Sequence, residues 1–287
     1  MEKLLCQAGA CAVGCVAVRR LEGVMGQDAL ERARQQVPGL HSLLCAAFPY
    51  APAELTAGSL SLYARGQDYH KVLQARLAPV AQTLETRHPG CRFQVFADAS
   101  PFPEVYAAAL AGLGKVGENG LLIVPGAGSY VFLGFLATDA QLPETVGEIR
   151  RCRGCGACRK ACPGKALGES LDQNRCLSAI TQQRGALTGE QTALVRAGGM
   201  LWGCDRCQLA CPENQHRTLP PLPEFAPLPD PTAADLQLSD RAFRKAFAQR
   251  AFVWRGVQPL RRNFEILKGN IPSAQQFAEQ EKESHHA

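Results

Sequence analysis

Residues 152–163 read CRGCGACRKACP, a run in which four cysteines are separated by two, two and three residues and followed by a proline. This C-x2-C-x2-C-x3-C-P spacing is typical of bacterial ferredoxins with two [4Fe–4S] clusters, in which the last cysteine of the run ligates the other cluster. A second run, Cys204-Asp-Arg-Cys207-Gln-Leu-Ala-Cys211-Pro212, follows downstream of Cys176. Together the two runs predict two [4Fe–4S] clusters, and therefore electron transfer.

The crossed arrangement of such proteins divides the eight cysteines into two ligand sets. The first set is Cys152, Cys155, Cys158 and Cys211, and the second set is Cys162, Cys176, Cys204 and Cys207. Zinc is the alternative, because C-x2-C pairs also build tetrahedral zinc sites. A third cysteine at the same spacing and the Cys-Pro end of each run favour clusters.

Basic residues surround the first run. They are Arg150, Arg151, Arg153, Arg159, Lys160 and Lys165. Two interpretations stay open: these cations offset the negative charge of clusters and thiolates, or they bind nucleic acid. We favour the first because it requires no partner.

The composition is that of an ordinary globular protein: 46% of the 287 residues are hydrophobic, 20% are charged and the net charge is +5. Thirteen cysteines are an odd number, and eight of them are clustered, which favours metal binding in a reducing compartment over disulfides. The remaining five are expected to be small, mostly buried apolar residues. They are Cys6, Cys11, Cys15, Cys45 and Cys91.

No stretch approaches the roughly 18 consecutive apolar residues of a membrane span. The segment Ala12-Val13-Gly14-Cys15 faintly resembles a lipoprotein cleavage box. However, Glu2 balances the positive charge of the N-terminal segment, and Gln7 interrupts the short apolar region that follows. A secretory signal is therefore not expected, and we predict a cytoplasmic protein without membrane contact.

The first 148 residues mix helical and strand patterns. Apolar residues recur at helical spacing from Asp68 to Leu84, and Phe93, Val95 and Ala97 alternate as in a strand. Residues 121–124 and 130–136 resemble two strands joined by the turn at 125–128. We therefore expect an α+β fold, with a mixed α/β domain over 1–148 and a bacterial ferredoxin-like module over 149–216. Residues 217–287 are expected to form a proline-rich linker, a basic helical segment and a polar tail.

Residues 112–117 read GLGKVG and match the G-x-G-x-x-G pattern of dinucleotide-binding proteins. That fingerprint follows a strand and opens a helix. Here a helical pattern precedes the glycines and a strand pattern follows them, so we do not expect a nicotinamide cofactor.

Several motifs taken together carry a resemblance to a known family. Residues 61–71 read SLYARGQDYHK, residues 98–120 read DASPFPEVYAAALAGLGKVGENG, and residues 129–139 read SYVFLGFLATD. With the two cysteine runs, and with Arg261-Arg262-Asn263 before Gly269-Asn270, the chain resembles the epoxyqueuosine reductases over most of its length. These enzymes complete queuosine in tRNA and use cobalamin and two [4Fe–4S] clusters, and their core is related to reductive dehalogenases.

The resemblance implies a corrinoid-binding role for the domain over 1–148 and a catalytic role for Asp98, as a general acid whose pKa is raised by burial. The residues that it places beside the corrinoid are Tyr63, Asp68, Tyr69, His70, Gly112, Gly114, Gly117 and Asn119. The alternative for Asp98 is a helix N-cap before residues 101–110. The alternative for residues 63–70 is a capped helix start, and His70 is not expected to ligate cobalt.

The sequence departs from the family pattern at several positions. Val105 stands where the family has arginine, Lys115 and Glu118 where it has tryptophan and lysine, and Phe135 where it has glutamate. The region before residue 48 is shortened, and the C-terminal helical repeats common in the family are not found, so we expect a short form. The loss of positive charge at positions 105 and 118 weakens the expectation of tRNA more than that of the cofactor.

The segment from Arg241 to Lys268 carries eight basic residues and one acid, Glu265. Such asymmetry is typical of a phosphate-binding surface, although solvated helices over buried aromatic residues are the plain alternative. The favoured function is a cobalamin-dependent reductase of epoxyqueuosine in tRNA, supplied by an external electron donor. The alternatives are a corrinoid reductase of a small molecule, and an electron carrier to a partner protein.

Overall fold

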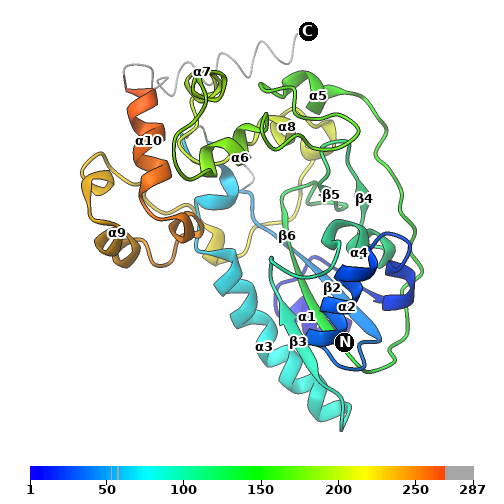
Figure 1. Ribbon diagram of the computed structural model, residues 1–287. Coiled ribbons are helices and arrows are strands. Elements are labelled where there is room, and N and C mark those ends of the chain that lie inside the picture. Colours follow the sequence, from blue (N-terminus) through cyan, green and yellow to red (C-terminus); the bar gives the residue numbers. More distant parts are fainter. Residues whose placement is uncertain (53, 57, 269–287) are drawn as a thin grey trace. The chain divides into compact units, whose positions relative to one another are not determined.

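The computed structural model describes residues 1–52, 54–56 and 58–268 and divides into two compact units (Figure 1). Unit 1 consists of Met1–Ala51, Tyr69–Gly154 and Gln215–Glu224, and the described residues of unit 2 lie within 52–68, Cys155–Asn214 and 225–268. Each unit thus combines three separate stretches, unlike the consecutive segments expected from the sequence. The motif pair Gly269-Asn270 and the expected polar tail lie outside the described residues.

Unit 1 is built on a four-stranded antiparallel sheet with the order β1-β2-β6-β3. The strands are β1 (Ala12–Ala17), β2 (Ser42–Pro49), β3 (Phe93–Phe96) and β6 (Val131–Thr138). Every residue of β2 is buried, as its unbroken apolar sequence predicts for a strand covered on both faces. The α+β class expected from the sequence is confirmed.

Helices cover both faces of this sheet. They are α1 (Glu2–Gln7), α2 (Gln27–Gln36), α3 (Tyr69–Arg87) and α4 (Glu104–Leu110). On one face, α3 brings Leu73 and Leu77 against Gly134 of β6. On the other face, the alanines of α4 share a core with Cys45 and Phe135. Because α4 is alanine-rich, it lies close to the strands and fixes the loop that follows it.

A short hairpin follows α4, formed by β4 (Lys115–Val116) and β5 (Leu122–Ile123). The sequence predicted that β5 and β6 would be joined by the turn at 125–128. Both strands exist, but they belong to different sheets, and only the bridge between Val124 and Gly128 closes the turn. β6 instead lies between β2 and β3, where its apolar side chains are buried on both faces.

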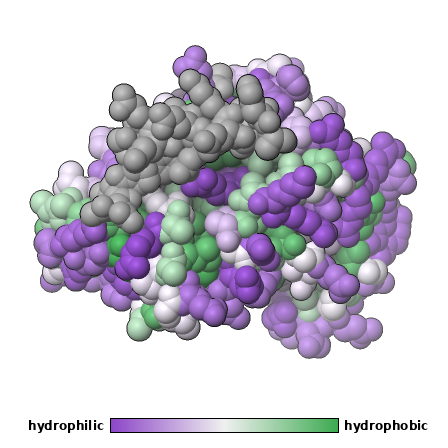
Figure 2. All heavy atoms as spheres, turned by 90° about the horizontal axis from the view of Figure 1, so that it is seen from above, coloured by the Kyte–Doolittle hydropathy of each residue, from purple (hydrophilic) through white to green (hydrophobic). Residues whose placement is uncertain are grey.

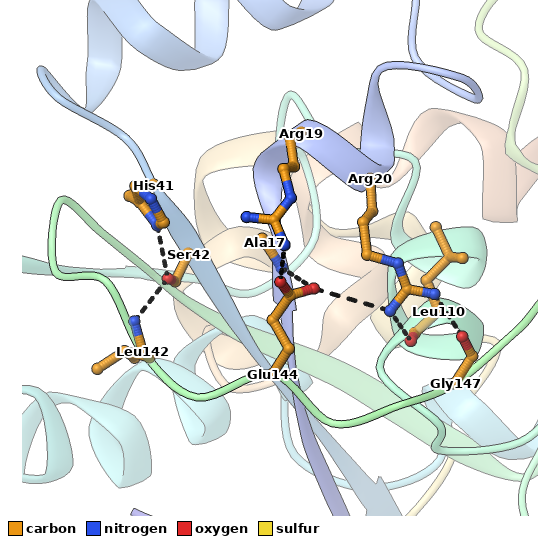
Figure 3. A network of polar contacts seen from close by, with 9 residues as sticks. All are labelled: Ala17, Arg19, Arg20, His41, Ser42, Leu110, Leu142, Glu144 and Gly147. Atoms are coloured by element: carbon orange, nitrogen blue, oxygen red, sulfur yellow. Dashed lines mark hydrogen bonds and ion pairs between the residues drawn. The ribbon is translucent and has the colours of Figure 1, made fainter.

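The connector after β6 is fixed to unit 1 by polar contacts (Figure 3). Glu144 accepts a hydrogen bond from the backbone N–H of Ala17 and forms ion pairs with Arg19 and Arg20. Arg20 in turn donates to the carbonyl oxygens of Leu110 and Gly147. The connector is therefore held against β1 and the end of α4 before it reaches Cys152.

Unit 2 is mostly helical. Its α-helices are α5 (Ala157–Ala161), α6 (Leu177–Gln182), α7 (Gly189–Gly198), α8 (Arg206–Leu209), α9 (Asp240–Ala246) and α10 (Gln258–Leu267). One apolar core gathers around the fully buried Trp202 and Phe243. A second core joins Ile180, Val195 and Leu267, so α10 closes over α6 and α7.

Residues 215–224, which include part of the expected proline-rich linker, pack within unit 1. The Arg217 guanidinium lies 4.9 Å from the ring centroid of Tyr130. Arg76 forms a bidentate ion pair with Glu224, with N–O distances of 2.8 and 2.7 Å. This stretch is therefore a structural part of the unit.

Hydrophilic side chains predominate on the face shown in Figure 2, with smaller apolar groups between them. Within the described chain, no helix combines the length and apolarity that crossing a bilayer requires. Of the five cysteines outside the runs, Cys15 and Cys45 are buried as expected, whereas Cys6 is exposed.

Candidate functional site

The loop that leaves β3 holds two residues in the left-handed backbone region. The φ angles are +61° at Asp98 and +51° at Ala99. Residues other than glycine rarely adopt this conformation, and alanine has no polar side chain to stabilise it. Backbone strain of this kind is retained where the surrounding structure imposes it, and it clusters at functional sites.

The first turn of α3 brings two predicted site residues to Asp98. The hydroxyl of Tyr69 donates a hydrogen bond to Oδ2 of Asp98, and Nε2 of His70 lies 3.1 Å from the same oxygen. The backbone N–H of Ala99 donates to Oδ1 at 2.7 Å. Half of the Asp98 side chain stays exposed, so the carboxyl group is held in place and remains accessible.

These contacts favour the ionised form of Asp98, whereas a protonated form was expected. The hydrogen bond with His70 is the main cause that holds the pKa of Asp98 well below its ordinary range, and the bonds from Tyr69 and Ala99 add to it. Burial acts in the opposite direction and is outweighed. Asp98 is therefore a carboxylate in this geometry, and the prediction of a raised pKa was wrong.

The capping alternative for Asp98 was also wrong. The N-cap position of α4 is Pro103, and no side chain caps the helix. Ser100 instead donates to Oε1 of Glu104 at 2.7 Å, and burial is the main cause that raises the pKa of Glu104. The charge of Asp98 raises the pKa of Glu104 further.

Two neighbouring carboxyl groups thus have pKa values displaced in opposite directions. Such a pair divides the roles of base and acid, because one group stays ionised while the other keeps its proton more readily. The sequence motifs alone indicate no role for Glu104. Its position in the first turn of a helix beside the Asp98 motif was the available signal.

Stacked aromatic rings hold Tyr69 in position. Its ring lies 4.2 Å from that of Phe132 and nearly parallel to it, at 6°, and it also stacks on His70 at 4.0 Å. Phe132 in turn stacks on Tyr50 at 4.4 Å. Because offset stacking restrains ring orientation, the hydroxyl of Tyr69 points at Asp98 with little freedom.

Packing and backbone conformation explain the glycines in the loop after α4. A Cβ atom at Gly114 would collide with the carbonyl oxygen of Ile123, and one at Gly117 with the side chain of Asn119. Gly112 has a φ of +82°, which favours glycine. Since a helix precedes the loop and a strand follows it, the arrangement is the reverse of a dinucleotide site, as expected.

Asn119 has a buried donor that its neighbours leave unused. Its Nδ2 is inaccessible to solvent and has no hydrogen-bond partner among the described residues. Its Oδ1 lies 3.3 Å from the backbone nitrogen of Leu121, which donates to it. An unpaired buried donor costs about 1–3 kcal/mol, so this amide is suited to a ligand that supplies an acceptor.

The glycine loop is connected to the first cysteine run. The backbone N–H of Val116 donates to the carbonyl oxygen of Arg150 at 2.8 Å, and that of Cys152 donates to the carbonyl oxygen of Val116 at 2.9 Å. These bonds extend the β4 hairpin by a parallel bridge to Arg151. Cys152 is therefore held on the same backbone framework as the loop.

The four thiols of the second set lie near one another in unit 2. Burial is the main cause that raises the pKa of Cys207 to about 12, and the nearby thiols of Cys204, Cys176 and Cys162 add to it. The backbone N–H of Ala166 donates to Sγ of Cys162 at 3.2 Å. Sulfur atoms grouped in this way, with N–H donors aimed at them, fit a cluster site.

Three members of the first set belong to unit 2, and Cys152 ends the connector of unit 1. Cys158 lies on α5, which contacts α8, and Cys211 follows α8. The grouping of Cys158 with Cys211 is therefore compatible with the crossed assignment, which stays a prediction for this set.

The predicted contacts Tyr63 and Asp68 belong to unit 2, whereas the other predicted corrinoid residues belong to unit 1. Trp202 Nε1 donates to the hydroxyl of Tyr63 at 2.8 Å. The buried Asp205 accepts from the hydroxyl of Ser61 at 2.5 Å and from the backbone N–H of Leu62 at 2.8 Å. The motif at 61–71 thus fixes the segment that carries Cys204 and, at the start of α8, Cys207.

Helix α10 fixes the same region through hydrogen bonds from Arg262 and Asn263, which together form a clamp. Asn263 Nδ2 donates to the carbonyl oxygens of Thr181 at 2.8 Å and Leu201 at 2.9 Å. Arg262 donates to carbonyl oxygens at the end of α6, including that of Gln183 at 2.7 Å. Because α6 starts directly after Cys176 and Leu201 precedes Cys204, these bonds hold two of the segments that carry second-set cysteines.

The hydrogen bonds of Arg262, and those of Arg261, contradict the phosphate-binding role that was expected for these two residues. Arg261 donates to the carbonyl oxygens of Leu236 at 2.7 Å and Leu238 at 2.8 Å. Other cations of the basic segment are also paired: Arg244 with Asp240 and Lys268 with Glu265. The sequence could not show the pairing of Arg261 and Arg262, because their partners are carbonyl groups far away in the sequence.

We expect Asn263→Ala to lower the free energy of unfolding by about 2–4 kcal/mol, because two buried carbonyl groups lose their donor. Iron bound by the second set should become easier to remove with a chelator. Thermal unfolding and chelation under anaerobic conditions measure both effects. The control is Arg241→Ala at an exposed position of α9, which should leave both quantities unchanged. Equal effects in the two variants would contradict the role of Asn263.

The chain matches two family models. One, described as epoxyqueuosine reductase QueG, matches residues 31–99, and the other, described as a 4Fe-4S double cluster binding domain, matches residues 151–214. The epoxyqueuosine reductase of Lactococcus garvieae is 37% identical over 223 residues, which cover 76% of this chain and 63% of the relative. That of Escherichia coli is 32% identical over 266 residues, covering 86% and 70%.

Solved structures agree with these matches. The epoxyqueuosine reductase from Streptococcus thermophilus aligns with a TM-score of 0.79 at 25% identity, covering 94% of this chain and 80% of that one. A crystal structure of an epoxyqueuosine reductase with an epoxyqueuosine-modified tRNA-Tyr stem loop aligns with a TM-score of 0.80 at 25% identity, covering 94% and 81%. The chain spans 63%, 59% and 66% of the first three curated relatives.

Proposed function

The chain belongs to the epoxyqueuosine reductase family, and from this premise we propose that it reduces epoxyqueuosine in tRNA to queuosine in the cytoplasm. The observation that carries the proposal is the Asp98 loop, where a strained backbone and two side chains from α3 present one carboxylate. The 4Fe-4S double cluster domain supplies a route for electrons.

The stoichiometry of the reaction determines what the protein must provide. Two electrons and two protons convert the epoxide to an alkene, and the epoxide oxygen leaves as water. A corrinoid, when bound, supplies the reducing chemistry at the epoxide. The chain's own residues position the substrate and provide protons to the departing oxygen.

Asp98 is the proposed catalytic residue, acting as a proton relay. A carboxylate delivers a proton only after it has received one, and the Tyr69 hydroxyl and the His70 ring are within hydrogen-bonding distance of it. Glu104 is the proposed local proton store, because burial favours its neutral form. The two roles follow from the opposite pKa displacements of the two carboxyl groups.

Several residues of unit 1 fit a corrinoid. The unpaired Nδ2 of Asn119 suits one of the carbonyl acceptors at the edge of a corrinoid, and Tyr69 offers a fixed aromatic ring. The glycines of the loop allow close approach of the backbone. Since Nε2 of His70 is bonded to Asp98, the structure supports the proposal that His70 is not a cobalt ligand.

tRNA is the proposed macromolecular substrate. Arg241 and Lys245 on α9 are exposed and form no ion pair among the described residues. With most other cations of the basic segment paired internally, few phosphate contacts are available. We therefore expect weak binding that falls with salt, by about 0.7–0.9 logarithmic units per contact.

Equilibrium dialysis with cobalamin and a turnover assay on epoxyqueuosine-modified tRNA test the proposal. We expect cobalamin to bind with a dissociation constant in the micromolar range, about 8 kcal/mol, and the loaded protein to form queuosine. Cluster absorption without corrinoid uptake would indicate an electron carrier. Corrinoid uptake without tRNA turnover would favour a small-molecule substrate.

A further inference from the structure

The cluster cysteines differ in their access to solvent. Of the eight predicted ligands, all within the described residues, Cys155 is the one that is exposed, and Cys158 is buried. The four members of the second set are intermediate in exposure. An electron from outside therefore has its most accessible entry at Cys155.

The chain beside Cys155 is strongly basic. Arg159 and Lys160 occupy the last turn of α5, and Lys165 follows three residues after Cys162. All three side chains are exposed. Between Cys155 and Lys165 the sequence contains no acidic residue.

Two of these cations, Lys160 and Lys165, are not neutralised locally. Neither Lys160 nor Lys165 forms an ion pair within the part of the chain that the structure describes. Cations whose task is to offset cluster charge work best when buried beside sulfur, where the dielectric is low. Exposed lysines instead project a positive field into solvent, which guides an oppositely charged partner.

We propose that the α5 surface, made of Cys155, Arg159, Lys160 and Lys165, docks an acidic one-electron carrier protein of the ferredoxin class. In the transfer, the carrier's reduced [2Fe–2S] centre loses one electron and the oxidised [4Fe–4S] cluster gains it; no atom or proton moves. The inference rests on the proposed function only in taking the clusters as the electron route. A redox partner fits this surface better than RNA, because the cations surround an electron entry point.

The test is the second-order rate of electron transfer between the anaerobically reconstituted full chain and an acidic plant-type [2Fe–2S] ferredoxin, followed by absorbance in the direction the potentials allow. Lys160→Glu with Lys165→Glu should lower this rate about tenfold or more at low ionic strength. The difference should close as the salt concentration approaches about 1 M, where charges are screened over about 3 Å. Reduction by the small cation methyl viologen should not become slower.

The matched control is Arg241→Glu with Lys245→Glu on α9, which changes the net charge by the same amount. Figure 1 shows α9 well apart from α5 within unit 2. The docking site would be overturned by an equal loss of the electron-transfer rate in both double variants, or by an unchanged rate in Lys160→Glu with Lys165→Glu. A loss of tRNA binding without a change in this rate would also overturn it. Clusters that methyl viologen cannot reduce would instead contradict the proposed function.

Discussion

Asp98→Asn is expected to lower kcat for epoxyqueuosine reduction by about 10²–10⁴-fold, the usual contribution of a positioned proton donor. Asparagine keeps the size of the side chain and an acceptor for Tyr69, but it cannot carry the proton. Cobalamin affinity and iron content should stay at the level of the unsubstituted protein. Single-turnover assays with preloaded cobalamin measure this loss directly.

The pH dependence distinguishes Asp98 from its neighbours. Because the pKa of Asp98 is lowered, the carboxylate stays ionised throughout the neutral range, and Asp98 should not produce a titration step in kcat there. Glu104 has a raised pKa, so activity that depends on its proton should fall as the pH rises, and Glu104→Gln should remove that step. An unchanged kcat in Asp98→Asn would restrict Asp98 to a structural role.

Cys176→Ser is expected to remove one cluster, so that iron falls from about eight to about four atoms per chain. Cys176 lies directly before α6, and its thiol is grouped with those of Cys204 and Cys207. Electron delivery should stop with the loss of either cluster, which abolishes turnover. Iron and sulfide analysis after anaerobic reconstitution measures the stoichiometry.

Cys6→Ser is the matched control, because Cys6 is exposed and belongs to neither predicted set. It should keep the full iron content. Cys211→Ser should lose the other half of the iron if the crossed assignment is correct. A stable protein that binds two zinc ions and no iron would contradict the cluster assignment altogether.

The sequence predicted what depends on local spacing. The cysteine runs identified the double cluster domain because ligand spacing is dictated by the metal chemistry itself. The helical periodicity from Asp68 to Leu84 predicted most of α3, since burial of one face leaves a regular apolar pattern. The motifs around Asp98 and Tyr69 identified residues that the fold does bring together.

What the sequence could not predict depends on distant partners. The pKa of Asp98 is set by side chains of α3, 28 and 29 residues away, so burial was the wrong guide. Arg262 was expected to meet phosphate because its charge was visible, whereas the carbonyl oxygen of Gln183, 79 residues away, was not. The separation of β5 and β6 into two sheets likewise follows from pairing across the unit.

The clamp at Asn263 has a consequence for the order of events during synthesis. Asn263 is made 56 residues after Cys207, the difference between 263 and 207. At about 5–20 residues per second, Cys207, the last thiol of the second set to be made, waits about 3–11 seconds before Asn263 of α10 is made. Iron delivered during that interval meets ligand segments that α10 does not yet hold.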